Sequence, residues 1–90
     1  MKEEHYKVNT ERILFTNLDD EGVIFDIEKN TYFNLNPTFC LIFSLLTEGR
    51  SVEEVKTQLM VDYNVNEEIC ESSLTESIQT LIQKGFISPV

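Results

Sequence analysis

The stretch that decides the fold is Phe25-Asp26-Ile27-Glu28-Lys29-Asn30-Thr31-Tyr32-Phe33-Asn34-Leu35-Asn36-Pro37. It contains two runs of alternating side chains, each with one more apolar face, which is typical of a half-buried strand. The polar segment 28–30 between the two runs predicts a turn. Asn36 is a good N-cap, and Pro37 suits the first position of a helix, where its missing N–H removes no hydrogen bond. We therefore expect a β-hairpin that leads directly into a helix.

A further strand is expected before the hairpin. Residues 12–16 are a short run of strand formers, and the segment 17–22 that follows is rich in turn residues. The two aspartates of that segment, Asp19 and Asp20, are expected to serve the turn rather than acid–base chemistry. The three strands would form an antiparallel sheet whose outer edge is the strand 31–35. Residues 1–9 are charged and are expected to be flexible.

Three helices are expected after the sheet. The first, from Pro37 to about Thr47, is apolar almost all round and is therefore the expected core helix. A capping box, Ser51-Val52-Glu53-Glu54, would begin the second helix after a stop at Gly49. The third helix would be capped by Asn66 and stopped by Gly85, after which the apolar residues 86–87 fold back onto the core. These helices must cover the apolar face of the sheet.

Length and charge limit the kinds of partner. The chain has 90 residues, 41% of them hydrophobic, which suits one domain spanning residues 1–90. Two helices joined by a tight turn beside a sheet also resemble a winged helix-turn-helix, so a winged-helix transcription regulator is the alternative from another class. Seven basic residues against 16 acidic ones give a net charge of -9, which repels phosphate backbones. We therefore expect no nucleic-acid partner.

The sequence lacks the usual parts of catalytic, metal and membrane sites. Cys40 and Cys70 are far apart and outside any CxxC motif, and the single histidine, His5, lies in a polar segment where a solvated side chain is expected. There is no Gly-rich phosphate loop and no His beside a Cys or Ser. No apolar run approaches the roughly 20 residues of a membrane span. We expect a cytoplasmic non-enzyme with no metal, cofactor or membrane partner.

The same deciding stretch, followed by an apolar helix that ends in Glu48-Gly49-Arg50-Ser51, resembles the PqqD-like family. These small domains, called RiPP recognition elements, bind leader peptides in pathways that modify ribosomally made peptides. The family segment, an Asp followed on the next strand by Tyr-Phe-x-Leu-Asn, is matched here by Asp26, Tyr32, Phe33, Leu35 and Asn36. The segment 81–87 is similar to the family's helix-Lys-Gly-apolar ending. The resemblance covers about 22–87. It implies an α+β fold of winged helix-turn-helix type, with an N-terminal three-stranded antiparallel sheet followed by three helices.

The resemblance also implies a function. A non-catalytic recognition protein of this family binds the leader of a precursor peptide as an added strand and presents it to a leader peptidase or another modifying enzyme. Physically, an open strand edge offers N–H and C=O groups with which an extended peptide can pair. A stand-alone domain of this size is similar to the separate recognition proteins of lasso-peptide clusters. A peptide chaperone for a radical-SAM enzyme, as in PqqD, is the alternative, and the sequence does not separate the two.

Candidate peptide-binding residues lie on one strand and one helix. Ser73 and Ser77 depart from the family, where an Asp and a bulky apolar residue are common, so small side chains there would either widen a groove or fit the core. Tyr32 would point to the opposite face of the strand from Phe33 and Leu35, whose side chains are expected in the core. The helix candidates form a stripe at i, i+3, i+4 and i+7. The full set is Thr31, Tyr32, Phe33, Asn34, Leu35, Cys70, Ser73, Leu74 and Ser77.

Overall fold

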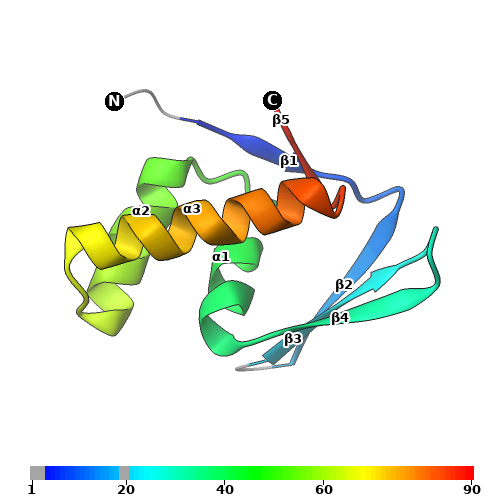
Figure 1. The fold of residues 1–90 in the computed structure, drawn as a ribbon, viewed down its shortest axis with the longest axis horizontal. Coiled ribbons are helices and arrows are strands. Elements are labelled where there is room, and N and C mark those ends of the chain that lie inside the picture. Colours follow the sequence, from blue (N-terminus) through cyan, green and yellow to red (C-terminus); the bar gives the residue numbers. More distant parts are fainter. Residues whose placement is uncertain (1–3, 19–20) are drawn as a thin grey trace.

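The computed structural model describes residues 4–18 and 21–90, so the expectations for residues 1–3 and for Asp19 and Asp20 lie outside the described residues. The described chain forms two antiparallel sheets and three helices (Figure 1). The predicted α+β fold, a three-stranded antiparallel sheet followed by three helices, is confirmed. The elements are, in order, β1 (Tyr6–Val8), β2 (Ile13–Leu18), β3 (Glu21–Asp26), β4 (Thr31–Leu35), α1 (Pro37–Thr47), α2 (Val52–Tyr63), α3 (Glu67–Gln83) and β5 (Ile87–Pro89).

The larger sheet has the strand order β2-β3-β4, which places β4 at an edge as predicted. The β3–β4 connection forms because the Asp26 carboxylate accepts a hydrogen bond of 3.1 Å from the Lys29 N–H, and because Asn30 adopts a φ of 56° that asparagine tolerates. The β2 strand is longer than expected: it continues to Leu18, into the segment that the sequence suggested was a turn.

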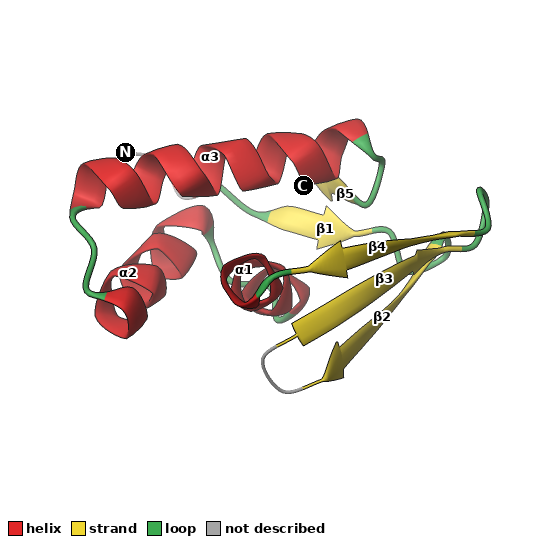
Figure 2. Cartoon of the chain, turned by 60° about the horizontal axis from the view of Figure 1, so that its bottom comes forward, coloured by secondary structure: helices red, strands yellow, loops and turns green. Residues whose placement is uncertain are grey.

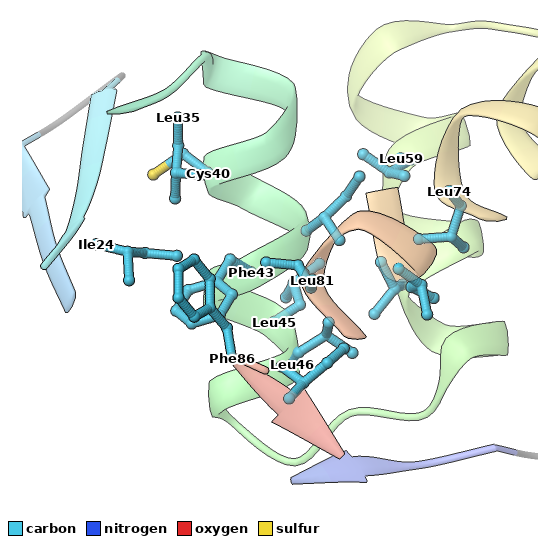
Figure 3. Close-up of a cluster of buried hydrophobic side chains, with 14 of the residues drawn as sticks. Ile24, Leu35, Cys40, Phe43, Leu45, Leu46, Leu59, Leu74, Leu81 and Phe86 are labelled. Atoms are coloured by element: carbon cyan, nitrogen blue, oxygen red, sulfur yellow. The ribbon is translucent and has the colours of Figure 1, made fainter. Parts of the chain in front are cut away.

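Helix α1 is the core helix, as its composition predicts. It packs against β3 and β4 on one side and against α2 and α3 on the other, so it lies between the sheet and α3 (Figure 2). Phe43 of α1 and Ile24 of β3 are fully buried (Figure 3). Ile42 of α1 is fully buried as well. The sheet therefore has an inner face, which packs on α1, and an outer face on the opposite side.

Helix boundaries follow the predicted caps. The side chain of Asn36 accepts a 2.8 Å hydrogen bond from the backbone N–H three residues later, and Asn66 does the same at the start of α3. Ser51 and Glu54 form both hydrogen bonds of a capping box. These local interactions satisfy backbone donors that the first turn of a helix leaves free. Each helix consequently begins at the residue that the sequence indicates.

The second sheet is a pairing that the sequence analysis did not anticipate. Strand β1 pairs antiparallel with β5, so that Val8 lies opposite Ile87. The segment 1–9 was expected to be flexible, whereas residues 6–8 are a paired strand and the Asn9 N–H donates to the Phe86 carbonyl oxygen at 2.9 Å. Phe86 and Ile87 are buried, which confirms that they fold back onto the core. The first and last described strands are thus joined to each other.

Candidate functional site

The outer edge of β4 is open. Within the described residues, β4 pairs with β3 on one side, and no strand pairs with its other side. The N–H and C=O groups that point outward from this edge are therefore available to another chain. Along the strand, Leu35 is buried and Phe33 half-buried, while Thr31, Tyr32 and Asn34 are exposed. The edge thus combines side chains anchored in the core with exposed ones.

A cleft of about 360 Å³ lies beside the end of this edge, between α3 and the first turn of α1. Ser73 and Ser77, the two serines among the predicted helix residues, belong to its lining. Asn36 also lines the cleft and follows β4 directly, so the cleft begins where the open edge ends. The remaining lining residues are Thr38 and Phe39 from α1 and Glu76 and Thr80 from α3.

The other two predicted helix residues, Cys70 and Leu74, are core residues. Each is 2% exposed, and with Ile78 and Leu81 they form the buried seam of α3. Successive helical residues turn by about 100°, which places Ser73 and Ser77 beside this seam rather than in it. The predicted stripe of four side chains is therefore divided, with Cys70 and Leu74 in the core and the two serines in the cleft wall. Contact of these residues with a peptide stays a prediction. Burial raises the pKa of the Cys70 thiol, which remains protonated at neutral pH.

A smaller cavity of about 170 Å³ adjoins the cleft and shares Thr38 and Ser73 with it. This cavity lies where the end of α2 meets the start of α3. Its lining is largely apolar, and the exposed Ile69 contributes to it. The cavity was not predicted, because the α2–α3 connection carries no sequence signal for where its two helices leave a gap. The remaining lining residues are Leu59, Tyr63, Val65 and Cys70.

An aromatic cluster lies under β4 at the end of α3. The Phe33 ring packs edge-on against Phe39, with 5.8 Å between centroids, and against Phe86 at 6.0 Å. The Lys84 ammonium group lies over the same ring, 4.7 Å from its centroid. Tyr32 points to the other face of the sheet, as predicted, where it is 73% exposed. Phe33 therefore supports the strand, and Tyr32 is free to contact a partner.

Sequence reasoning missed the cleft residues from α1, and a signal for them existed. The Asn36-Pro37 pair places the first turn of α1 at the end of the edge strand, so the next side chains, Thr38 and Phe39, must lie beside that edge. Glu76 and Lys84 carried no comparable signal, because charged residues on a helix are usually solvated. Glu76 gives the cleft wall a carboxylate.

The described residues show neither a metal-ligand cluster nor a membrane span. Residues 4–18 and 21–90 contain no group of three His, Cys, Asp or Glu side chains that could hold a metal ion. Within the same ranges, every helix is too short or too polar to cross a membrane. The features that remain are an open strand edge and an adjacent cleft.

These features define a class of protein: small winged-helix-type α+β domains that present an open sheet edge beside a helix-walled cleft. The family model described as coenzyme PQQ synthesis protein D (PqqD) matches residues 21–87, and the chain belongs to this family. The matched segment runs from the start of β3 to the start of β5, so it includes β4, α1 and α3. The family resemblance inferred from the sequence is confirmed.

Two similar solved structures were found. The first, TbiB1 in complex with the TbiA(beta) leader peptide, is 28% identical with a TM-score of 0.85, covering 91% of this chain and 94% of that chain. The second, a lasso peptide synthetase B1 complexed with the leader peptide, is 25% identical with a TM-score of 0.83, covering 94% of this chain and 99% of that chain. A comparison with curated proteins found no match.

Proposed function

We propose that this chain is a leader-recognition protein of lasso-peptide biosynthesis. It binds the leader of a ribosomally made precursor as an added strand on β4 and presents the peptide to a leader peptidase or another modifying enzyme. The observation that carries this proposal is the open β4 edge beside the cleft lined by Ser73 and Ser77. The two structural neighbours, both solved with leader peptides, support it.

The leader would bind as a fourth strand antiparallel to β4. About four to six backbone hydrogen bonds, at a net ~0.5 to 1.5 kcal/mol each, would offset part of the cost of ordering the peptide. Its side chains alternate between the two faces of the extended sheet, so one set faces the cleft beside Ser73 and Ser77. One or two apolar anchors, at roughly 1.5 to 3 kcal/mol each, would bring the affinity to about micromolar or tighter.

The direction of β4 fixes the direction of the leader. β4 runs from the turn at residues 27–30 toward Asn36 and the cleft. An antiparallel leader therefore begins beside the cleft and leaves the site at the β3–β4 turn. The segment to be modified follows the leader in a precursor, so the receiving enzyme would act near that turn.

The chemistry is assigned to the enzyme that receives the peptide, and this chain is proposed to be non-catalytic. Its two cysteine thiols are buried. The ring of His5 contacts the Gly49 carbonyl oxygen at 3.1 Å, away from the cleft. Recognition would take place in the cytoplasm, where precursors are synthesised.

The family description favours a second candidate, a PqqD-type chaperone for a radical-SAM enzyme. The same edge and cleft would serve it, with a different enzyme receiving the peptide. We prefer the lasso-peptide assignment because the second structural neighbour, which matches nearly the whole of both chains, is a lasso peptide synthetase B1.

A matched pair of substitutions on α3 tests the proposal. Ser77→Arg places a long side chain in the cleft, whereas Ser72→Arg adds the same group on the exposed side of the helix. With a synthetic leader from the precursor gene beside the gene for this chain, calorimetry should show binding that Ser77→Arg weakens by at least about 1 to 2 kcal/mol. Ser72→Arg should leave the affinity unchanged. Unchanged affinity in a folded Ser77→Arg variant, judged by circular dichroism, would refute the site.

A further inference from the structure

The outer sheet face carries an apolar surface that, apart from Tyr32, lies outside the proposed leader site. We define the outer sheet face by its apolar residues, which are Leu14, Leu18, Val23, Phe25 and Tyr32 from the strands and Ile27 from the adjoining turn. Thr16, Glu21 and Asn34 also point to this side of the sheet. The register places Leu14, Phe25 and Tyr32 in one row across the three strands, with the Phe25 and Tyr32 rings 4.8 Å apart. Leu14 and Leu18 are each 57% exposed and Ile27 is 47% exposed. These side chains face solvent on the side opposite α1.

Such a face is unusual for this chain. The solvent side of an antiparallel sheet is ordinarily polar, and an edge strand such as β2 is ordinarily protected by charged side chains. Here 26% of all residues are charged. Among the residues of β2, β3 and β4 that point to the outer side, Glu21 at the start of β3 is the charged one. The row that contains Val23 also holds the uncharged polar residues Thr16 and Asn34, so the face is apolar at its other positions apart from Glu21. An exposed apolar surface with so few charges is typical of an interaction site.

Charge and position decide what covers this face. A second copy of the chain is disfavoured, because each copy has a net charge of -9 and the two would repel. The described helices pack on the inner side of the sheet, so none of them covers the outer one (Figure 2). Tyr32 belongs both to the outer sheet face and to the open edge strand β4. A leader strand added to β4 would therefore widen this face with its own alternate side chains.

We propose that the outer sheet face docks the leader peptidase that receives the peptide, through an apolar surface bordered by Lys and Arg side chains. The inference rests on the proposed function, since a partner seated here touches both the sheet and the leader strand added to it. The basic border follows from the net charge of this chain, which steers a cationic surface toward it.

The size of the face makes docking dependent on the leader. Strands of about six residues, ~3.3 Å per residue and ~4.8 Å apart, give three strands a plan area of about 300 Å². A stable interface buries about 800 Å² on each partner. The added leader strand and its side chains enlarge the outer sheet face and so supply part of the area that the three strands lack. The peptidase should therefore bind the leader-loaded chain more tightly than the empty chain.

The test uses the full chain and the purified leader peptidase encoded beside it. Leu14→Ser/Leu18→Ser changes two exposed residues of β2, the strand farthest from the leader edge. Val61→Ser is the matched control, because Val61 is 72% exposed on α2. Biolayer interferometry, with and without saturating leader, should show peptidase affinity at least about tenfold weaker in the double variant and unchanged in the control. Leader affinity, measured separately, should be the same in all three chains.

The outcomes separate the two proposals. If the double variant binds the peptidase as tightly as the original chain, the inference is overturned while leader binding still supports the proposed function. If no chain binds leader, the proposed function fails, and a loss of direct peptidase affinity in the double variant still supports the docking face. A homodimer of the original chain that the double variant disperses, seen by sedimentation equilibrium, would assign the face to a second copy and overturn the inference. Leu18→Ser alone, with a smaller loss expected, replaces the double variant if circular dichroism shows that the latter does not fold.

Discussion

The ammonium group of Lys84 lies 4.7 Å from the centre of the Phe33 ring and joins the end of α3 to the edge strand β4. Phe33 is the half-buried residue of that strand, and its ring also packs against Phe39 and Phe86. The contact thus joins the C-terminal end of α3 to the middle of β4. The cleft opens at the end of β4, beside Asn36.

Replacing Lys84 should weaken this junction. Lys84→Met keeps an unbranched side chain but removes both the cation over Phe33 and a positive charge at the C-terminal end of α3. We expect the free energy of unfolding to fall by about 1 kcal/mol in urea titrations. Lys29→Met, in the exposed β3–β4 turn, is the control and should change the free energy of unfolding far less. Equal stability of the two variants would mean that the contact contributes nothing.

Two glycines with positive φ provide a matched comparison of backbone strain and crowding. Gly49 has a φ of 85° and open space around its Cα, whereas Gly85 has a φ of 77° and lies against the Arg12 guanidinium. Gly49→Ala should lower the free energy of unfolding by about 1 to 2 kcal/mol, because alanine is strained in the left-handed conformation. Gly85→Ala should lower the free energy of unfolding by the same strain and by a small further amount, because the flexible end of the Arg12 side chain can move aside but then leaves Asp26. In an Arg12→Ala background the extra cost should disappear, and its persistence would contradict this explanation.

Asp26 should make stability depend on pH in the acid range. Burial disfavours its ionised form, but hydrogen bonds from the Lys29 N–H and the Arg12 guanidinium outweigh burial and hold the pKa of Asp26 below its ordinary value of 3.8. A folded-state pKa below the unfolded one stabilises the fold above pH ~4 and loses that effect as the pH falls through the lowered pKa. The stability difference between the original chain and Asp26→Asn should therefore be largest at neutral pH and shrink under acid conditions. A difference that stays constant on acidification would contradict the assignment.

The elements that could be predicted are those that local chemistry determines. Asn36-Pro37, the Ser51–Glu54 box and Asn66 each satisfy backbone donors within one helical turn, so the sequence alone locates those helix starts. The β1–β5 pairing could not be predicted in this way. It joins two three-residue strands from opposite ends of the chain, neither of which has a pattern of its own. Such a contact depends on α1 and α3 bringing the ends together.

The site was predictable only in part, for the same reason. The edge position of β4 follows from strand order, and the helix that faces it follows from the family resemblance. Which α3 residues reach the cleft depends on how the helix is rotated against α1 and α2, which buries Cys70 and Leu74 and leaves Ser73 and Ser77 beside the cleft. Apolar residues at helical spacing show that one face of a helix is apolar. They do not show where along that face burial ends.

Strand addition on β4 is the central claim, and an N-methyl scan of the leader tests it most directly. Successive N–H groups of an added strand point alternately toward and away from β4, so N-methylation should remove a sheet hydrogen bond at every second residue. We predict that calorimetry will show losses of about 1 to 3 kcal/mol at alternate leader positions and little change at those between them. Losses without this period of two, or full affinity at every position, would contradict strand addition on β4.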